Sequence, residues 1–250
     1  MEVLGIDIGG SGVKGAIVDT ETGQFVTDRV RIDTPQPSTP EAVIGVMKEI
    51  VDTLNYSGPV GVGFPAVVLD GVLMSAANVD HSWIGYPGQQ KMEERMGCKV
   101  TLLNDADVAG IAEMRFGAGK GRRGVVMIFT LGTGIGSSMF VNGRIVPNTE
   151  LGHIYLPGQP LGQDAEDVTA SSVRTNEDLS WEAWGGRLNV YFNEIEKLFS
   201  PNLIIVGGGV SKKYEEFFPY IKVRAELQPA QLRNKAGIVG AALAAIGEGM

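Results

Sequence analysis

The sequence predicts an α/β fold built from two related halves, and three observations support this prediction. Short apolar runs rich in valine and isoleucine alternate with longer segments whose apolar residues recur at helical spacing. Glycine is unusually frequent, with 35 residues that gather in short groups beside the apolar runs. The strand, glycine turn and strand that open the chain return near residue 124. We therefore expect an internal duplication with a ligand bound between two lobes.

The first half begins with a predicted β-hairpin, in which strands at 2–9 and 12–19 flank the tight turn GGSG. Residues 40–54 predict an amphipathic helix, which Thr39 can cap and which has Pro40 in its first turn. The remaining elements predicted in this half are strands at 60–65 and 99–103 and a helix at 105–116 that ends at Gly117.

The second half repeats the opening theme, since residues 124–146 predict strand, glycine-rich turn, strand, turn and strand. A helix at 180–199, a strand at 202–209 and a closing helix near 236–247 follow. We expect two lobes around a cleft: a small N-terminal lobe of residues 1–108, onto which residues 236–250 pack back, and a large C-terminal lobe of residues 109–235.

Composition restricts the class of protein. The chain has 250 residues, of which 44% are hydrophobic, enough for one large domain or two smaller lobes. No run of about 18 apolar residues predicts a membrane span, and the opening MEVLGIDIGG lacks the basic segment of a signal peptide. Cys98, the single cysteine, is expected to be buried and predicts a cytoplasmic protein. The net charge of −8 argues against a general nucleic-acid-binding protein.

The segment CKVTLLNDADVAG, residues 98–110, places a carboxylate directly after an apolar strand. Aspartate is unfavourable in strands and favourable at helix N-caps, so Asp105 can cap the helix that follows. The alternative is that the strand presents Asp105 to a substrate as a general base. Asp107 is expected to face solvent or to cap the helix.

The segment NTELGH places Glu150 and His153 three residues apart. On one helical turn this spacing puts both side chains on the same side. A carboxylate and a neutral imidazole can bind adjacent hydroxyl groups of a ligand, whereas the alternative is a histidine with structural hydrogen bonds only.

Four motifs together carry a family resemblance: DIGGSGVKG, LNDADVAG, TLGTGIGS and ELGH. In this order they resemble the ROK sugar kinases, which share the actin-like, hexokinase-type fold, a duplicated ribonuclease H-like architecture. Within that family the chain resembles the polyphosphate glucokinases most, through segments such as AANVDHSWIG, VPNTELGH, EDLSWEAW and PAQLRNKAGIVGAALAA. The resemblance covers nearly the whole chain, and the number and order of the motifs make it specific.

The resemblance implies a function. The chain is expected to phosphorylate glucose at the 6-hydroxyl, with inorganic polyphosphate and also ATP as donors. Asp105 matches the general base of the family, which accepts the hydroxyl proton as the phosphoryl group arrives. The sugar contacts that the resemblance assigns are Asn78, Asn104, Asp105, Glu150, His153 and Glu166, with Trp83 packing near Asn78.

The phosphate side is expected to come from backbone. The turns at 9–12 and 132–136 can present N–H groups and hydroxyls to anionic oxygens, although either turn alone is also typical of a plain β-turn. The loop at 207–209 resembles the one under the nucleotide in ATP-using relatives. The expected phosphate contacts are Gly9, Gly10, Ser11, Gly12, Lys14, Gly132, Thr133, Gly134, Gly208 and Gly209.

The resemblance also implies a metal. Asp7 matches the metal-binding acid of this fold and is expected to hold Mg²⁺ directly or through water. Many ROK proteins follow the ExGH stretch with a zinc-binding cysteine cluster, but residues 154–180 contain no cysteine. One cysteine and two histidines cannot fill such a tetrahedral site, so no zinc site is expected. This departure leaves open how the segment around Glu166 is held.

Cations gather beside the glycine turns of this acidic chain. We interpret them as a track for a long polyanion, the alternative being ordinary solvated surface charge. The expected track residues are Lys120, Arg122, Arg123, Lys212, Lys213 and Arg233, with Lys235 close to the last of these.

Three other functions remain as alternatives. An ATP-dependent ROK hexose or N-acetylhexosamine kinase differs in its donor and sugar. A sugar-responsive ROK regulator carries a helix-turn-helix before the first hairpin, for which the few residues before the turn leave no room. A non-catalytic actin-like assembly module does not need the ND, ELGH and glycine-turn motifs together. The residues do not say whether mannose is accepted or which polyphosphate length is preferred, and a homodimer is expected from the family alone.

Overall fold

The computed structural model describes residues 1–77 and 79–250, and its chain divides into two compact units. The first unit contains residues 1–116 and 234–250, and the second contains residues 117–233. The division therefore follows residue 116 and not residue 108, because the whole helix that begins at Asp105 packs on the closing helix of the first unit. The first unit, expected to be the smaller, is the longer of the two.

The first unit contains a six-stranded sheet in the order β3-β2-β1-β5-β8, with β4 paired to β2. Its strands are β1 (Glu2–Gly9), β2 (Gly12–Asp19), β3 (Gln24–Phe25), β4 (Val30–Ile32), β5 (Val60–Phe64) and β8 (Val100–Asn104). The predicted hairpin is confirmed, since β1 and β2 are antiparallel with Gly9 opposite Gly12. The strands β1, β5 and β8 are parallel, so their carboxyl ends meet at one edge of the sheet.

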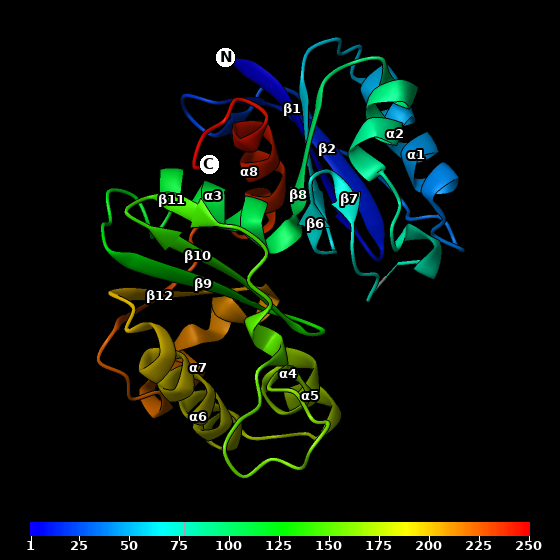
Figure 1. The fold of residues 1–250 in the computed structure, drawn as a ribbon. Coiled ribbons are helices and arrows are strands. Elements are labelled where there is room, and N and C mark those ends of the chain that lie inside the picture. The colour runs from blue at the N-terminus through cyan, green and yellow to red at the C-terminus, as the bar shows by residue number, and fades with distance from the viewer. Residues whose placement is uncertain (78) are drawn as a thin grey trace. The chain divides into compact units, whose positions relative to one another are not determined.

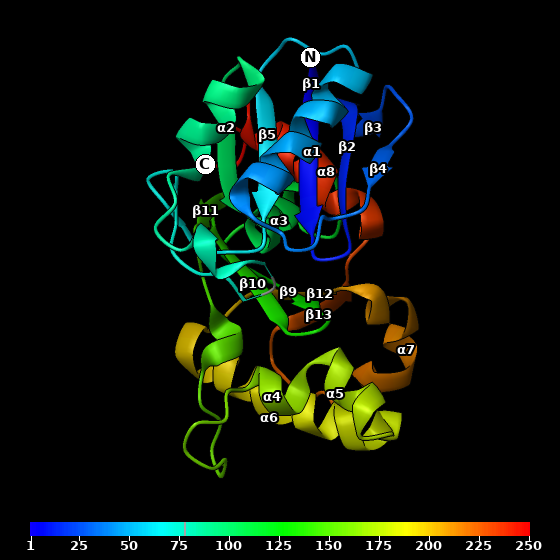
Figure 2. The ribbon, with the colours of Figure 1, turned by 90° about the vertical axis from the view of Figure 1, so that its right-hand side faces the viewer.

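Helices cover both faces of this sheet, as Figures 1 and 2 show. On one face lie α1 (Pro40–Thr53) and α2 (Gly88–Met96), and on the other lie α3 (Asp105–Phe116) and α8 (Ala236–Ala244). The first unit also contains three short elements, β6 (Val68–Leu69), β7 (Val72–Leu73) and η1 (His81–Trp83). The 3-10 turn η5 (Arg233–Lys235) leads from the second unit into α8. Thr39 occupies the N-cap position of α1, but its side chain makes no capping hydrogen bond there.

The close packing of α8 explains two glycines in the strands. A Cβ atom added at Gly5 would overlap the carbonyl oxygen of Ile238, and one added at Gly61 would overlap that of Ala241. Only glycine allows the helix backbone to lie directly on the strands. The close packing of α8 thus holds β1 and β5, two of the strands whose carboxyl ends meet at one edge of the sheet.

The second unit repeats the strand order in a five-stranded sheet, β11-β10-β9-β12-β13. Its strands are β9 (Val125–Leu131), β10 (Ile135–Val141), β11 (Arg144–Val146), β12 (Leu203–Gly207) and β13 (Glu226–Pro229). The pair β9 and β10 is antiparallel, whereas β9, β12 and β13 are parallel. Because both units have an antiparallel hairpin followed by parallel strands, the fold is the duplicated α/β architecture that the repeated pattern predicts.

The core of the second unit is aromatic. The long helix α6 (Trp181–Phe199) is capped by the preceding residue, Ser180, whose hydroxyl accepts a hydrogen bond of 3.1 Å from the backbone N–H of Ala183. Its face packs Trp184, Tyr191 and Phe192 against the sheet, with the Phe129 ring 5.4 Å from that of Phe192. The other elements are α4 (Glu166–Thr169), α5 (Ser171–Asn176), α7 (Tyr214–Phe217), η2 (Leu151–His153), η3 (Gly209–Lys213) and η4 (Phe218–Tyr220).

Two further expectations concern single features. Cys98 is half-buried against the core and not fully buried, because it lies in the turn before β8; burial raises the pKa of its thiol. Within the described part of the chain, every helix is too short or too polar to cross a membrane.

Candidate functional site

The junction between β8 and α3 presents Asp105. Asn104, the last residue of β8, accepts hydrogen bonds at its Oδ1 from the backbone N–H groups of Ala106 (2.8 Å) and Asp107 (3.3 Å). The side chain of Asn104 therefore caps the helix. Asp105 is half-buried at the first position of α3, at the carboxyl end of a parallel strand.

The expectation for Asp107 is wrong, and Asn104 gains a further role. Asp107 is completely buried and does not face solvent, because α3 packs closely against α8: a Cβ atom at Gly240 would overlap the carbonyl oxygen of Val108. Asn104 is also buried, and its Nδ2 donates to the carbonyl oxygen of Ala66 at 3.2 Å. The amide of Asn104 thus has a structural role that the sequence did not reveal.

The turn between β1 and β2 has two cationic side chains beside it, each paired with an aspartate. The Nζ of Lys14 lies 3.3 Å from Oδ2 of Asp7, and both side chains are partly exposed. The guanidinium of Arg31 lies 2.6 Å from Oδ1 of Asp33 and donates to the carbonyl oxygen of Ser11 at 2.9 Å. Sequence reasoning missed Arg31; pairing of β4 with β2 places it opposite Lys14. The tip of the turn, Gly10 and Ser11, is exposed.

The turn between β9 and β10 is held from the neighbouring helix. The N–H of Gly132 donates to the carbonyl oxygen of Gly134 at 3.0 Å. Ser172 of α5 donates from its hydroxyl to the carbonyl oxygen of Thr133 (2.6 Å) and from its N–H to that of Gly132 (3.0 Å). Ser172 was not predicted to belong to the site. Gly132 and Thr133 remain exposed.

The loop after β12 lies beside this turn. Gly208 has a φ of 86°, and a Cβ atom there would overlap the backbone of Leu131, which precedes Gly132. Glycine is therefore required for both the conformation and the close approach. The two loops proposed for phosphate in this unit, 132–134 and 208–209, are thus neighbours in space.

Glu150 and His153 flank a single 3-10 turn, η2. The N–H of His153 donates to the carbonyl oxygen of Glu150 at 3.2 Å. Residues of β10 and α6 hold this turn. The N–H of Leu151 donates to the Ser137 hydroxyl (3.0 Å), and the Tyr191 hydroxyl donates to the carbonyl oxygen of Leu151 (3.2 Å). Burial raises the pKa of Glu150, and the nearby carboxylate of Glu166 raises it further, although His153 opposes them.

Glu166, at the start of α4, joins this turn to the glycine turn. Its Oε2 accepts a hydrogen bond of 2.8 Å from the N–H of Ile135, and its Oε1 lies 3.9 Å from Nδ1 of His153. A Cβ atom at Gly134 would lie 2.5 Å from Oε2, and one at Gly152 would lie 3.0 Å from it. Glycine at these two positions makes room for the carboxylate, which explains how the segment is held without a cysteine cluster.

Asp164 is a further member of the cluster that sequence reasoning did not find. Its Oδ2 lies 2.7 Å from Nδ1 of His153. Burial lowers the pKa of His153, but the hydrogen bond that the ring donates to Asp164 and the charges of Glu166, Asp164 and Glu150 outweigh burial, so that the pKa is raised. The only sequence signal was an acidic pair two residues apart after the ELGH motif.

The remaining predicted residues are less closely grouped. Asn78 lies outside the described residues. Trp83 belongs to the core of the first unit, where its ring is fully buried and its Nε1 donates to the carbonyl oxygen of Ser38 at 2.8 Å. Among the predicted track residues, Arg122 forms an ion pair with Glu226, and Lys213 lies 6.0 Å from the centre of the Trp181 ring. The others are exposed side chains, namely Lys120, Arg123, Lys212 and Arg233.

Residues 1–77 and 79–250 contain no group of three or more His, Cys, Asp or Glu side chains that could hold a metal ion. Asp7 nevertheless offers a partly exposed carboxylate, and oxygen donors of this kind suit Mg²⁺, which keeps several waters and uses few protein ligands.

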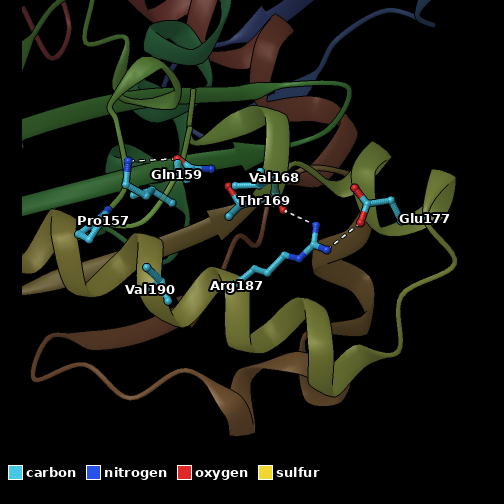
Figure 3. Close-up of a pocket in the computed structure, with 8 residues that line it drawn as sticks. Pro157, Gln159, Val168, Thr169, Glu177, Arg187 and Val190 are labelled. Atoms are coloured by element: carbon cyan, nitrogen blue, oxygen red, sulfur yellow. Dashed lines mark hydrogen bonds and ion pairs between the residues drawn. The ribbon is translucent and has the colours of Figure 1, made fainter. Parts of the chain in front are cut away.

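A pocket of about 300 Å³ lies between the loop at 156–159, the end of α4 and the helix α6 (Figure 3). Its lining residues are Leu156, Pro157, Gln159, Val168, Thr169, Glu177, Arg187 and Val190. Arg187 spans its edge, donating to the carbonyl oxygen of Val168 (3.2 Å) and to Oε2 of Glu177 (2.7 Å), as Figure 3 shows. None of the predicted site residues lines this pocket, which instead marks where α4 is attached to α6.

Comparisons with known proteins agree with this picture. The family model described as ROK family matches residues 3–170. The polyphosphate glucokinase of Mycobacterium tuberculosis is 46% identical over 246 residues, which cover 98% of this chain and 91% of that protein.

Solved structures give the same result for the fold. The inorganic polyphosphate/ATP-glucomannokinase from Arthrobacter sp. strain KM superposes with a TM-score of 0.89 at 45% identity, covering 98% of both chains. The ROK family glucokinase from Streptomyces griseus, solved in complex with glucose and AMPPNP, superposes with a TM-score of 0.82 at 26% identity, covering 99% of this chain and all of the other.

Proposed function

The chain belongs to the ROK family, and from this premise we propose that it transfers a phosphoryl group from inorganic polyphosphate, and also from ATP, to the 6-hydroxyl of glucose. One observation carries the proposal beyond similarity. The Glu166 carboxylate, a sugar ligand in this proposal, accepts a hydrogen bond from the N–H of Ile135, directly after the glycine turn proposed for phosphate. The acceptor and donor groups of a phosphoryl transfer must meet, and this contact links their two binding elements.

The sugar is bound mainly by the second unit in this proposal. Glu150, His153 and Glu166 offer two carboxylates and an imidazole within one hydrogen-bonded cluster. Carboxylates accept hydrogen bonds from sugar hydroxyls, and the imidazole can accept or donate one. Asn104 is proposed to contact the sugar through Nδ2, because its Oδ1 caps α3. Asn78 remains a proposed contact on the resemblance alone.

Asp105 acts as the general base. Its carboxylate accepts the proton of the sugar hydroxyl while the oxygen forms a bond to the terminal phosphorus. The bond from that phosphorus to the bridging oxygen breaks, so the donor leaves as a polyphosphate one unit shorter, or as ADP. The place of Asp105 supports this proposal, because it is half-buried at the carboxyl end of a parallel strand, where the sheet presents its side chains to a ligand.

The phosphates of the donor are bound by the glycine loops. Backbone N–H groups near Gly10 and Ser11 and near Gly132 and Thr133 are at exposed turn tips, where an anion can reach them. Lys14 adds a cation next to the first turn. Gly208 and Gly209 lie beside the second turn and extend the same surface.

Asp7 is the residue that would hold Mg²⁺. When bound, the ion neutralises charge on the phosphate oxygens during transfer. Lys14 lies 3.3 Å from the same carboxylate. When Asp7 binds the ion, the Lys14 ammonium can contact a phosphate oxygen instead. Dialysis against EDTA is expected to abolish turnover, and added Mg²⁺ is expected to restore it; full activity after complete removal of divalent ions would contradict this assignment.

The donor preference follows from charge. A long polyanion needs a path of cations that leads from the site, and Lys120, Arg123, Lys212 and Lys213 are exposed near the glycine loops in sequence. Arg122 contributes less than expected from sequence, because Glu226 already pairs with it.

The decisive experiment measures phosphorylation of glucose with polyphosphate and with ATP under identical conditions. Formation of glucose 6-phosphate with both donors, and faster with polyphosphate, is expected. Activity with ATP but with no length of polyphosphate would refute the donor assignment and leave an ATP-dependent kinase. A parallel assay with mannose extends the test to the second sugar. We further propose a homodimer and a cytoplasmic location, which rest on the family and on the single cysteine.

A further inference from the structure

The contact between Asp164 and His153 defines which ring nitrogen is available to a ligand. The Oδ2 of Asp164 lies 2.7 Å from Nδ1 of His153, a normal distance for a strong hydrogen bond. Glu166 approaches the same nitrogen only to 3.9 Å, too far for a hydrogen bond. Asp164 is therefore the residue that acts directly on this side of the ring.

The position of Asp164 is fixed by its own segment. Its N–H donates to Oδ2 of Asp167 at 2.9 Å, and the N–H of Asp167 donates back to the carbonyl oxygen of Asp164 at 3.1 Å. The next residue, Ala165, is fully buried and donates to the carbonyl oxygen of Ile154 at 2.9 Å. The attachment through Arg187 in Figure 3 holds the following helix on α6. Asp164 is thus held more firmly than a typical surface acid.

A carboxylate only accepts hydrogen bonds, so the proton between the two groups belongs to Nδ1 of His153. In the neutral ring the other nitrogen, Nε2, then carries no proton and accepts a hydrogen bond. Carboxylates orient metal-binding histidines in the same way, by fixing the tautomer and the ring orientation.

We propose that Asp164 is a positioning residue that keeps the proton of His153 on Nδ1, so that Nε2 accepts a hydrogen bond from a sugar hydroxyl. The statement about the sugar rests on the proposed function, whereas the statement about the tautomer does not.

The charges around the ring set the pH range in which the tautomer matters. Burial alone would lower the pKa of His153, but the groups that face the ring, Asp164, Glu166 and Glu150, raise it and so favour the doubly protonated ring at lower pH. Without Asp164 the raised pKa is expected to fall. Above that pKa the ring is neutral, and the tautomer then decides whether Nε2 accepts or donates.

The test uses nitrogen NMR of the full chain labelled at histidine. The sequence has two histidines, so the substitution His81→Gln, at an exposed position, leaves His153 as the single signal. At a pH above its titration, we expect a protonated Nδ1 and an unprotonated Nε2 in this background. Asp164→Ala is expected to remove the preference for the Nδ1 proton and to lower the pKa of the ring. Glu177→Gln serves as the control, because it removes an ion pair with Arg187 at the same helix attachment without touching His153.

Kinetics provide the second measurement. Asp164→Ala is expected to raise the glucose KM about tenfold, the equivalent of one hydrogen bond worth about 1.4 kcal/mol, and to change kcat at saturating glucose much less. Asp164→Asn keeps the size and an acceptor oxygen, so it should retain part of the tautomer preference and of the affinity even if the alanine variant folds poorly. The control Glu177→Gln should change neither quantity.

The outcomes separate the two proposals. An unchanged tautomer in both Asp164 variants would overturn the inference, whatever the activity. A changed tautomer with an unchanged glucose KM would overturn the positioning role. A changed tautomer in a protein that phosphorylates no sugar would support the role of Asp164 on the ring and refute the proposed function instead.

Discussion

The two units share a strand order, yet different side chains surround their glycine turns. At the turn of the first unit lie Lys14 and Arg31, each paired with an aspartate, and Arg31 donates to the backbone of Ser11. At the corresponding turn of the second unit, the Glu166 carboxylate accepts from the N–H of Ile135. The duplicated fold therefore supplies equivalent backbone turns, whereas side chains from β4 in the first unit and from α4 in the second give them different neighbours. In the proposed function both turns bind donor phosphates, and only the second also adjoins a sugar ligand.

The largest expected effect concerns the acid of the first unit. Asp105→Asn removes the base while keeping its size, so kcat is expected to fall by about 10²–10⁴-fold with glucose binding largely retained. Turnover and glucose binding are measured separately, by initial rates and by titration calorimetry. Near-full turnover of Asp105→Asn would mean that the first unit contributes no base.

The next effect concerns the turn of the second unit. Gly134→Ala would put a Cβ atom 2.5 Å from Oε2 of Glu166 and must displace that carboxylate. We expect the glucose KM to rise about tenfold, because a hydrogen bond to a charged group is worth about 1.5–3 kcal/mol. Gly132→Ala is the matched control, since nothing lies within 4 Å of its added Cβ atom. Equal glucose KM values for the two variants would show that Glu166 does not hold the sugar.

A pH profile can sharpen the assignment of Glu150. Because burial raises the pKa of this carboxyl, it gains a proton at a higher pH than an ordinary glutamate. Glucose affinity is expected to fall, by up to about tenfold, as the pH decreases through that raised pKa, since a hydrogen bond from the sugar to the charged form is lost. Glu150→Gln should bind glucose more weakly and lose this dependence, leaving the effect of His153, whose pKa is also raised. An unchanged profile in the variant would show that the dependence does not come from Glu150.

The smallest effect concerns the donor. Replacing Lys212 and Lys213 by glutamine is expected to raise the KM for long polyphosphate about threefold, because exposed charges contribute about 0.2–1 kcal/mol each. The difference should disappear at high salt, where charges are screened over a few ångströms. Replacing Lys197 and Lys222 is the matched control, with two exposed lysines of the same unit outside the proposed track. A similar loss in both double variants would indicate a general charge effect and no track.

The order of the glycine turns, the acid after β8 and the lack of zinc ligands could be read from the sequence, because they depend on local patterns and on counts. Strand alternation and helical spacing report the backbone conformation of neighbouring residues, and they located both hairpins and most helices. The same local information could not separate the two roles of the ND pair. Both residues are good N-caps, and only the structure shows that the Asn104 amide caps α3.

The rest of the site depended on contacts between distant segments. Arg31 reaches the first turn because β4 pairs with β2, and Glu166 reaches the second across 31 residues of sequence. Asp164 meets His153 because the loop between them folds back, with Ala165 hydrogen-bonded to Ile154. Such contacts are set by the packing of whole elements, which leaves no periodic signal in the sequence. The sequence by itself thus determined the scaffold and the family, whereas tertiary structure decided which polar side chains surround each turn.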